Sequence, residues 1–380
     1  MIQTRQATWN ESDGWLGLPP AEEAAEADLV FLFGAREHLE RGQSHQQIAS
    51  HFPNAIIAGC STAGEICGTE ASDATLIATA MSFHDTTVGS TSVDLSDYAD
   101  SRAAGAALIQ KLPSEGLRHV LVLSDGNVVN GSELVNGLRS AAPEGVQVTG
   151  GLAGDAERFE RTLVVYGDQA LPAQVIAVGF YGDNLRIGFG SLGGWDPFGP
   201  ERLITRSDGN ILYELDGRSA LDLYRKYLGP YAQNLPTSSF LFPLGLRASE
   251  GEEGIVRTVL TIDEDRDAMI FAGDMPEGHY ARLMKANFDR LIGGAELAAE
   301  HSSTGLSGRT ADFALLISCV GRKIVLKQRV EEELEGVRRV LGDEAVLAGF
   351  YSYGEISPFS AETTCRLHNQ TMTITTFVED

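Results

Sequence analysis

The 380-residue sequence is poor in cysteine, with four thiols at positions 60, 67, 319 and 365. No two of them form a C-x-x-C pair, so a zinc site is not expected and we predict no bound metal. So few thiols in a chain of this length are typical of a reducing compartment. The polar start, MIQTRQATWNESDGW, lacks the basic and apolar segments of a secretory signal. We therefore expect a cytoplasmic protein.

Basic residues and long apolar runs are also scarce. The chain has 29 Lys and Arg against 53 Asp and Glu, which gives a net charge of −24. Such an acidic surface repels phosphate backbones and anionic lipid, so we expect no nucleic-acid partner. No run reaches the roughly 20 apolar residues of a membrane span, so no membrane insertion is expected. The length predicts two domains, or one large two-part unit.

One eight-residue pattern, G-x-x-[ST]-x-G-E-I, occurs near each end of the chain. It reads GCSTAGEI over residues 59–66 and GFYSYGEI over 349–356, each time after an apolar run. The sequence before the pattern recurs too. ADLVFLFGARE (27–37) precedes the first copy, and the similar ADFALLISCVGRK (311–323) precedes the second. Two strand–helix–strand units that end in the same turn predict two pseudo-related halves.

The remaining pattern indicates an α/β to α+β fold with mixed β-sheets flanked by helices. Apolar runs at 28–35, 55–60 and 119–126 predict buried strands, and alternating segments at 75–83 and 86–95 predict antiparallel ones. A clean helical pattern begins at GRSALDLYRKYLG, residues 217–229. We place the domain boundary there. The predicted organisation is an N-terminal extension (1–27), an N-terminal domain (28–216) and a C-terminal domain (217–380).

The first copy of the pattern is the leading candidate for a ligand site. A strand that ends in Ser61 and Thr62 presents hydroxyls at the carboxyl edge of a sheet, where ligands bind in open α/β folds. Gly64 permits a positive φ or a close approach. Glu65 can bind a ligand ammonium or accept bonds from its own turn. Pocket lining and pure turn structure both remain open.

Cys60, within the same pattern, is a candidate nucleophile. A catalytic cysteine needs a base or a positive setting, and no histidine or lysine is near it in the sequence. Phe350 occupies the same place in the second copy, so the shared role does not require a thiol. We predict a buried, inert Cys60, and a Cys60-dependent enzyme is the least favoured alternative.

Other polar strand ends add candidates, each with a structural alternative. Gly151 and Asp155 lie in GGLAGD, which lacks the lysine of a phosphate loop and can equally serve close packing. Ser124 and Asp125 can form an Asx turn. Trp195 suits an aromatic or amino-group ligand, or a junction. The full ligand-binding set is Cys60, Ser61, Thr62, Gly64, Glu65, Ser124, Asp125, Gly151, Asp155, Trp195, Asp196, Tyr351, Tyr353 and Glu355.

Taken in order, GCSTAGEI, GGLAGD and GFYSYGEISPF resemble the FIST family, named for F-box and intracellular signal transduction proteins. WDPFGPERLITRSDGNILYELDGRSALDLYRKYLG (195–229) resembles the junction of the family's two halves, and VRTVLTIDEDRDAMIFAGDMPEG (256–278) the core of its second half. The resemblance covers most of residues 28–360.

The resemblance implies a non-catalytic sensory protein of bacterial signal transduction. It implies a small ligand, with an amino acid or related metabolite as the leading class. From the duplicated turns we expect that binding shifts the packing of the two halves, and that a signalling partner such as a histidine kinase reads the shift. Some members of the family bind haem and sense nitric oxide, which makes haem the alternative. The sequence has no C-x-x-C-H for covalent attachment, and none of its eight histidines stands out as an axial ligand.

Overall fold

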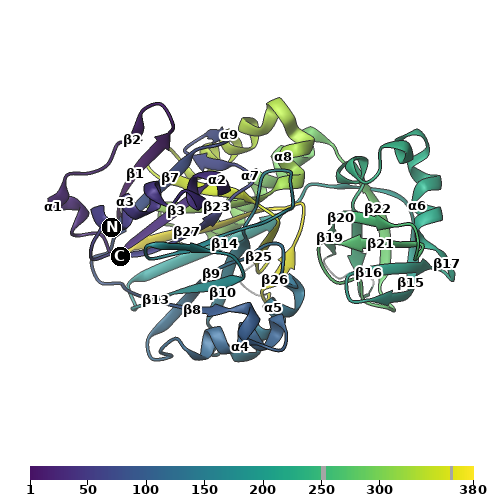
Figure 1. Cartoon of the computed structure of the whole chain (residues 1–380), viewed down its shortest axis with the longest axis horizontal. Coiled ribbons are helices and arrows are strands. Elements are labelled where there is room, and N and C mark those ends of the chain that lie inside the picture. Colours follow the sequence, from purple (N-terminus) through teal and green to yellow (C-terminus); the bar gives the residue numbers. More distant parts are fainter. Residues whose placement is uncertain (250–253, 360–362) are drawn as a thin grey trace.

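The computed structural model describes residues 1–249, 254–359 and 363–380. Its larger body contains three mixed β-sheets with helices around them, and a smaller body, the small domain (residues 196–285), lies beside it at the right of Figure 1. Mixed sheets flanked by helices confirm the predicted fold class. None of the described helices is long and apolar enough to cross a membrane.

The first sheet lies in the N-terminal part of the larger body. Its strands, in spatial order, are β12 (Gln169–Leu171), β11 (Val164–Tyr166), β4 (Ile56–Ser61), β3 (Leu29–Gly34), β7 (Leu76–Ser82), β1 (Gln3–Asn10) and β2 (Gly14–Leu16). The helices of this region are α1 (Ala21–Ala24), α2 (Arg36–Glu40) and α3 (Gln43–His51).

The second and third sheets complete the larger body. The second contains β26 (Arg366–His368), β25 (Gly354–Ser357), β10 (Gln147–Leu152), β9 (Leu117–Ser124), β13 (Gln174–Tyr181) and β8 (Thr87–Asp94), with α4 (Ser101–Gln110) and α5 (Gly131–Ala141). The third contains β14 (Leu185–Leu192), β27 (Met372–Glu379), β23 (Phe313–Cys319), β24 (Val346–Ser352), β5 (Glu65–Cys67) and β6 (Glu70–Ser72), with α7 (Phe288–Thr304), α8 (Val320–Leu326) and α9 (Val330–Leu341).

Each of these sheets is built around the same unit, a parallel pair with an antiparallel neighbour. The pairs are β3–β4, β9–β10 and β23–β24, and the neighbours are β7, β13 and β27. The first and third units are the two related halves that the repeated pattern predicts. That prediction is confirmed. The second unit is a further copy that the sequence pattern did not reveal, because GGLAGD replaces the repeated turn there.

A glycine marks the same place in all three units. A Cβ at Gly59, Gly150 or Gly349 would lie 1.7–1.8 Å from a carbonyl oxygen of the facing strand, so no larger residue fits. Just beyond it the chain crosses into another sheet: β5 pairs with β24, β25 with β10, and β11 with β4. The three units are therefore joined in a closed cycle of exchanged strands.

Aromatic side chains fill the space between the three sheets. Phe31 and Phe33 of β3 meet Phe313 and Phe350 of the third sheet, with ring centroids 6.1 Å and 4.7 Å apart. All four are fully buried. Alternate residues of β3 face the other way, toward α3, which explains why this strand reads as a continuous apolar run.

The small domain has its own antiparallel sheet and its own core. Its strands are β19 (Ile255–Arg257), β18 (Leu244–Arg247), β22 (Tyr280–Lys285), β15 (Asp196–Asp208), β16 (Ile211–Leu215), β21 (Ala268–Phe271) and β20 (Val259–Asp263), with β17 (Arg218–Ser219) beside β16 and the helix α6 (Ala220–Leu228). Leu221, Tyr224 and Leu228 of α6 are buried in this core. The predicted boundary at residues 216–217 falls in the turn between the paired strands β16 and β17, inside one sheet.

Candidate functional site

The glutamates of the two repeated turns have matching partners. Glu65 accepts hydrogen bonds from Thr62 Oγ1 (2.5 Å) and from the amide and hydroxyl of Thr75 (3.2 and 2.6 Å). Glu355 accepts from Ser352 Oγ (2.7 Å) and from the amide and hydroxyl of Thr371 (3.2 and 2.9 Å). The two threonines immediately precede β7 and β27. Each glutamate thus ties its turn to the next strand of its unit.

Both glutamates are buried, and burial raises the pKa of Glu65 to about 7 and that of Glu355 to about 8. Hydroxyl and amide donors oppose this rise because they stabilise the carboxylate. The alternatives left open by the sequence, ligand contact or turn closure, are resolved in favour of turn closure for Glu355. Glu65 closes its turn and also borders a cavity.

The second unit performs the same task with Asp125. Its carboxylate accepts from the amides of Asn127 and Val128 at 2.8 and 2.9 Å, and from the amide of Ala173, which precedes β13, at 3.0 Å. This is the predicted Asx turn. Ser124 is buried and its hydroxyl donates to the carbonyl of Asp125, and Gly151 packs against Ile317. These residues are structural.

Cys60 and Ser61 are also interior residues. Burial among the core aromatics raises the pKa of the Cys60 thiol well above its ordinary value, so the thiolate is disfavoured. Ser61 Oγ donates to the carbonyl of Gly154 (2.8 Å) and accepts from the amide of Leu163 (2.9 Å). The expectation that both side chains contact a ligand is corrected, because each is enclosed by the protein.

Asp155 meets arginine rather than a ligand amine. Its buried carboxylate lies 2.9 Å from Arg158 Nε and 3.3 Å from Arg36 Nη1. Two cations around one carboxylate hold the loop that follows GGLAGD onto α2. Sequence reasoning missed these arginines because they lie outside every motif.

Trp195 and Asp196 lie apart from the turns. Trp195 Nε1 donates to the carbonyl of Gln370 at 2.8 Å, and the indole packs on Leu291. Asp196 forms an ion pair with Arg290 at the start of α7. They match the alternative prediction of a junction between halves, and their assignment to the ligand site is corrected.

The two tyrosines of the second turn differ from each other. Tyr351 is fully buried and its hydroxyl donates to Glu333 at 3.0 Å. Tyr353 stacks on Phe159, with ring centroids 4.3 Å apart, and its hydroxyl accepts from the Phe159 amide at 3.0 Å. Tyr353 borders a cavity of about 510 Å³ between the larger body and the small domain.

The cavity that best fits the predicted ligand site has a volume of about 600 Å³ and lies at the carboxyl ends of β3 and β4. All three units contribute to it. Its lining is Ala35, Glu37, His38, Arg41, Thr62, Ala63, Gly64, Glu65, Asp73, Ala74, Ala156, Glu157, Arg158, Val320 and Lys323. Of the predicted site residues, the structure brings Thr62, Gly64 and Glu65 together here.

The charges around this cavity are of both signs. Lys323 Nζ donates to the carbonyl of Ala63 at 2.9 Å and pairs with Asp73. Arg158 pairs with Glu37 at 2.6 Å. His38 is largely buried, and its Nε2–H donates to the carbonyl of Ala74 at 2.9 Å. Its Nδ1 has no partner within the described part of the chain and is left as an acceptor.

Haem does not fit the residues of this cavity. A haem pocket needs apolar walls and an axial ligand, whereas here Glu37, Asp73 and Arg158 form the walls. The buried histidines elsewhere, His45, His119 and His368, are bonded to the carbonyl of Asp168, to Thr149 and to the carbonyl of Ser357, respectively. Within residues 1–249, 254–359 and 363–380, no cluster of three or more His, Cys, Asp or Glu is placed to hold a metal ion.

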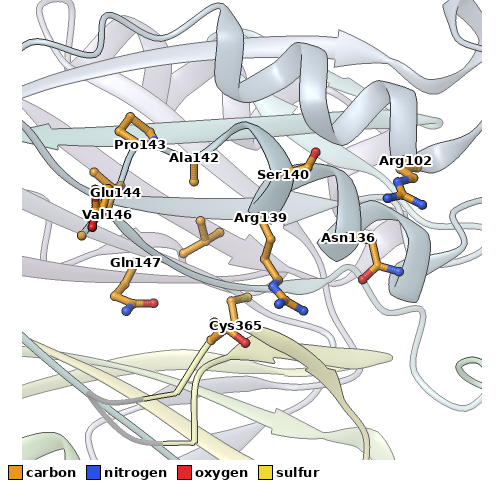
Figure 2. Close-up of a pocket in the computed structure, with 13 residues that line it drawn as sticks. Arg102, Asn136, Arg139, Ser140, Ala142, Pro143, Glu144, Val146, Gln147 and Cys365 are labelled. Atoms are coloured by element: carbon orange, nitrogen blue, oxygen red, sulfur yellow. The ribbon is translucent and has the colours of Figure 1, made fainter.

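A further cavity of about 460 Å³ lies at the amino end of β10 (Figure 2). Arg102, Asn136 and Arg139 come to it from the helices, and Cys365 approaches from the other side. In open α/β sheets ligands bind at the carboxyl ends of the strands, which favours the cavity beside the first turn instead.

Comparison with known proteins identifies the family. A model of the FIST N domain matches residues 28–218, and one of the FIST C domain matches residues 220–358. The chain belongs to the FIST family. FIST domains are sensory domains of signal transduction.

The individual relatives add little on function. An uncharacterized protein of Methanocaldococcus jannaschii is 21% identical over 90% of this chain and 71% of its own length. An uncharacterized protein of Mycobacterium bovis is 25% identical over 49% of each chain. A crystal structure of cyanuric acid hydrolase from A. caulinodans aligns with all of this chain and 99% of that one, at 9% identity and a TM-score of 0.42.

Proposed function

We propose that this FIST protein is a non-catalytic sensor that binds a small zwitterion, such as an amino acid or related metabolite, in the 600 Å³ cavity beside the first turn. The observation that carries the proposal is that all three units supply its walls, with cations and carboxylates both present. The volume lies within the roughly 300–1,000 Å³ of ordinary ligand sites.

The charged side chains suggest how such a ligand is held. The carboxylate of the ligand replaces Asp73 as the partner of Lys323, or Glu37 as the partner of Arg158. The ammonium of the ligand then forms an ion pair with the protein carboxylate that has been released. Exchanging internal ion pairs for ligand contacts limits the desolvation cost of binding.

Signalling follows from the position of the cavity. The turn of residues 62–65 belongs to the first unit, residues 156–158 to the second and Lys323 to the third. A ligand that prefers one arrangement of the three units shifts their packing toward it. A signalling partner, such as a histidine kinase, reads that shift. The burial of Cys60 and the charged cavity walls favour this function over a thiol enzyme or a haem sensor.

Calorimetric titration with each standard amino acid tests the proposal. At least one is expected to bind, and Lys323→Gln is expected to weaken it about 10- to 100-fold, because a charged hydrogen bond contributes about 1.5–3 kcal/mol. Lys285→Gln, at an exposed position in the small domain, is the matched control. Absence of binding by every amino acid, or an unchanged affinity in Lys323→Gln, would contradict it.

A further inference from the structure

Arg257 is a buried cation with an unusual set of partners. It is 4% exposed and lies at the end of β19 in the small domain. Its guanidinium donates to the carbonyls of Leu367 (3.0 Å), Val256 (3.3 Å) and Asp274 (3.3 Å), and more weakly to Asn369 Oδ1 (3.5 Å). Within the described part of the chain, no carboxylate lies within ion-pair distance of it. The carboxylates of Asp274 and Glu355 act on it only from beyond ion-pair distance, and carbonyl dipoles compensate a buried charge less well than a contacting carboxylate does.

Arg322 shows how this protein otherwise buries an arginine. It is fully buried, and Glu333, equally buried, accepts from its Nη2 at 2.7 Å and its Nε at 3.1 Å. The carbonyls of Gly193 and Leu291 accept further hydrogen bonds from its Nη1 (2.6 Å) and Nη2 (2.8 Å). The difference is the carboxylate, which Arg322 has and Arg257 lacks.

A cleft of about 270 Å³ lies at Arg257, between α5 of the larger body and the small domain. Arg139 of α5 borders it from the other side, as it also borders the cavity of Figure 2, and its side chain makes neither a hydrogen bond nor an ion pair with any described residue. The lining is Ser132, Val135, Asn136, Arg139, Leu246, Arg247, Ala248, Ile255, Arg257, Asp274, Pro276, His279, Arg366 and Leu367.

The balance of charge in the cleft is positive. Glu201 neutralises Arg247 through two hydrogen bonds of 2.6 and 2.5 Å. Asp274 is the acidic residue of the described lining, and its carboxylate accepts from Asn130 Nδ2 at 3.2 Å. Arg257 and Arg139 therefore leave an excess of cation in a chain whose net charge is −24. An anion approaching this acidic protein is attracted only where the local field is reversed.

We propose that this cleft binds the oxyanion group, phosphate or carboxylate, of a small molecule, and that Arg257 and Arg139 donate hydrogen bonds to it. The anion takes the place that Glu333 occupies beside Arg322. Guanidinium groups match the geometry of both oxyanions, through paired N–H donors. Because Arg139 belongs to the larger body and Arg257 to the small domain, the bound anion links the two. The site is separate from the cavity at Lys323 and does not depend on the proposed function.

Titration calorimetry of the full chain with inorganic phosphate, and separately with acetate, tests the site. Saturable binding of either anion is expected, and the anion that binds more tightly identifies the source. Arg257→Gln and Arg139→Glu are each expected to weaken it about tenfold or more. Arg218→Glu, at an exposed position of β17 outside the cleft, is the matched charge control and should leave the affinity unchanged.

Arg139→Glu decides the question if Arg257→Gln does not fold, because Arg139 is exposed and holds no internal bond. Failure of the wild-type chain to bind either anion saturably would overturn the proposal, as would equal binding by Arg139→Glu and the wild-type chain. Lys323→Gln should bind phosphate or acetate normally, so a failed amino-acid site and a failed oxyanion site are distinguished.

Discussion

The two copies of the repeated turn have the same hydrogen bonds but different surroundings. Glu355 is sealed, and a Cβ at Gly354 would lie 3.0 Å from Leu152. The turn of residues 62–65 instead forms a wall of the 600 Å³ cavity, where a Cβ at Gly64 would meet Lys323. The shared residues therefore build a corner of the fold, and the neighbouring segments decide whether a ligand can reach it.

The largest expected effect is a loss of stability when the glycine before either turn is replaced. It tests whether the backbone is packed equally closely at the two turns. Gly349→Ala and Gly59→Ala should each destabilise the protein by about 4 kcal/mol, since the new methyl would overlap a carbonyl of the facing strand. Urea unfolding measures both. Gly293→Ala, in α7 with open space around it, is the control and should be neutral or slightly stabilising. A small cost at Gly349 or Gly59 would break the equivalence.

A smaller effect should separate the two glutamates. Glu355→Ala should cost about 3 kcal/mol, because it leaves the Thr371 amide and the Ser352 hydroxyl buried without a partner. Glu65→Ala should cost about 1–2 kcal/mol, because water from the cavity can replace the carboxylate. Urea unfolding at slightly acidic pH gives both values. Equal costs would indicate that the first turn is as sealed as the second.

The pH dependence of stability should separate the same two residues. A carboxyl whose pKa is raised on folding favours the folded state at low pH, and this advantage is lost as pH rises from 4.5 toward the folded pKa. The loss is about 1.4 kcal/mol per unit of pKa difference. It should end near pH 7 for Glu65 and near pH 8 for Glu355.

Glu355→Gln should therefore flatten the stability profile between pH 7 and 8 more than Glu65→Gln does, because folded Glu65 has already lost about half of its proton by pH 7. The lowered pKa values of buried His119 and His368, about 3 and 4, keep these groups neutral throughout that interval. Denaturant unfolding at closely spaced pH values measures the slope. An unchanged slope in Glu355→Gln would contradict the assignment.

The smallest effect concerns the thiols beside the first turn. Cys67 is half-buried, whereas Cys60 is fully buried, so iodoacetamide should label Cys67 first and Cys60 only as the protein unfolds. Mass spectrometry of the labelled peptides follows both rates. Rapid labelling of Cys60 in the folded protein would reopen the thiol-enzyme alternative.

Much of the fold could be predicted from the sequence, because β3, β4 and β23 are apolar runs and the repeated turns flank them. The second unit escaped prediction because Asp125, at a different position, performs the task of the two glutamates. The small domain also escaped, because all of its strands except β15 are at most six residues long and its boundaries carry no motif.

The candidate site could be predicted only in part. Thr62, Gly64 and Glu65 were found because they lie in a motif at a strand end. Lys323, Arg158 and His38 were not, since the cavity brings them together from three distant units. Trp195 and Asp196 were misassigned because an aromatic residue beside an acid suits a junction as well as a ligand.

Hydrogen exchange of the two turns tests the central claim most directly. The standard amino acids are added together to the full chain, and peptides covering 59–66 and 349–356 are followed by mass spectrometry. The account predicts slower exchange at residues 62–65 and no change at 352–355, because the first turn alone forms a wall of the cavity. Slower exchange in the second turn alone, or no change in either, would contradict it.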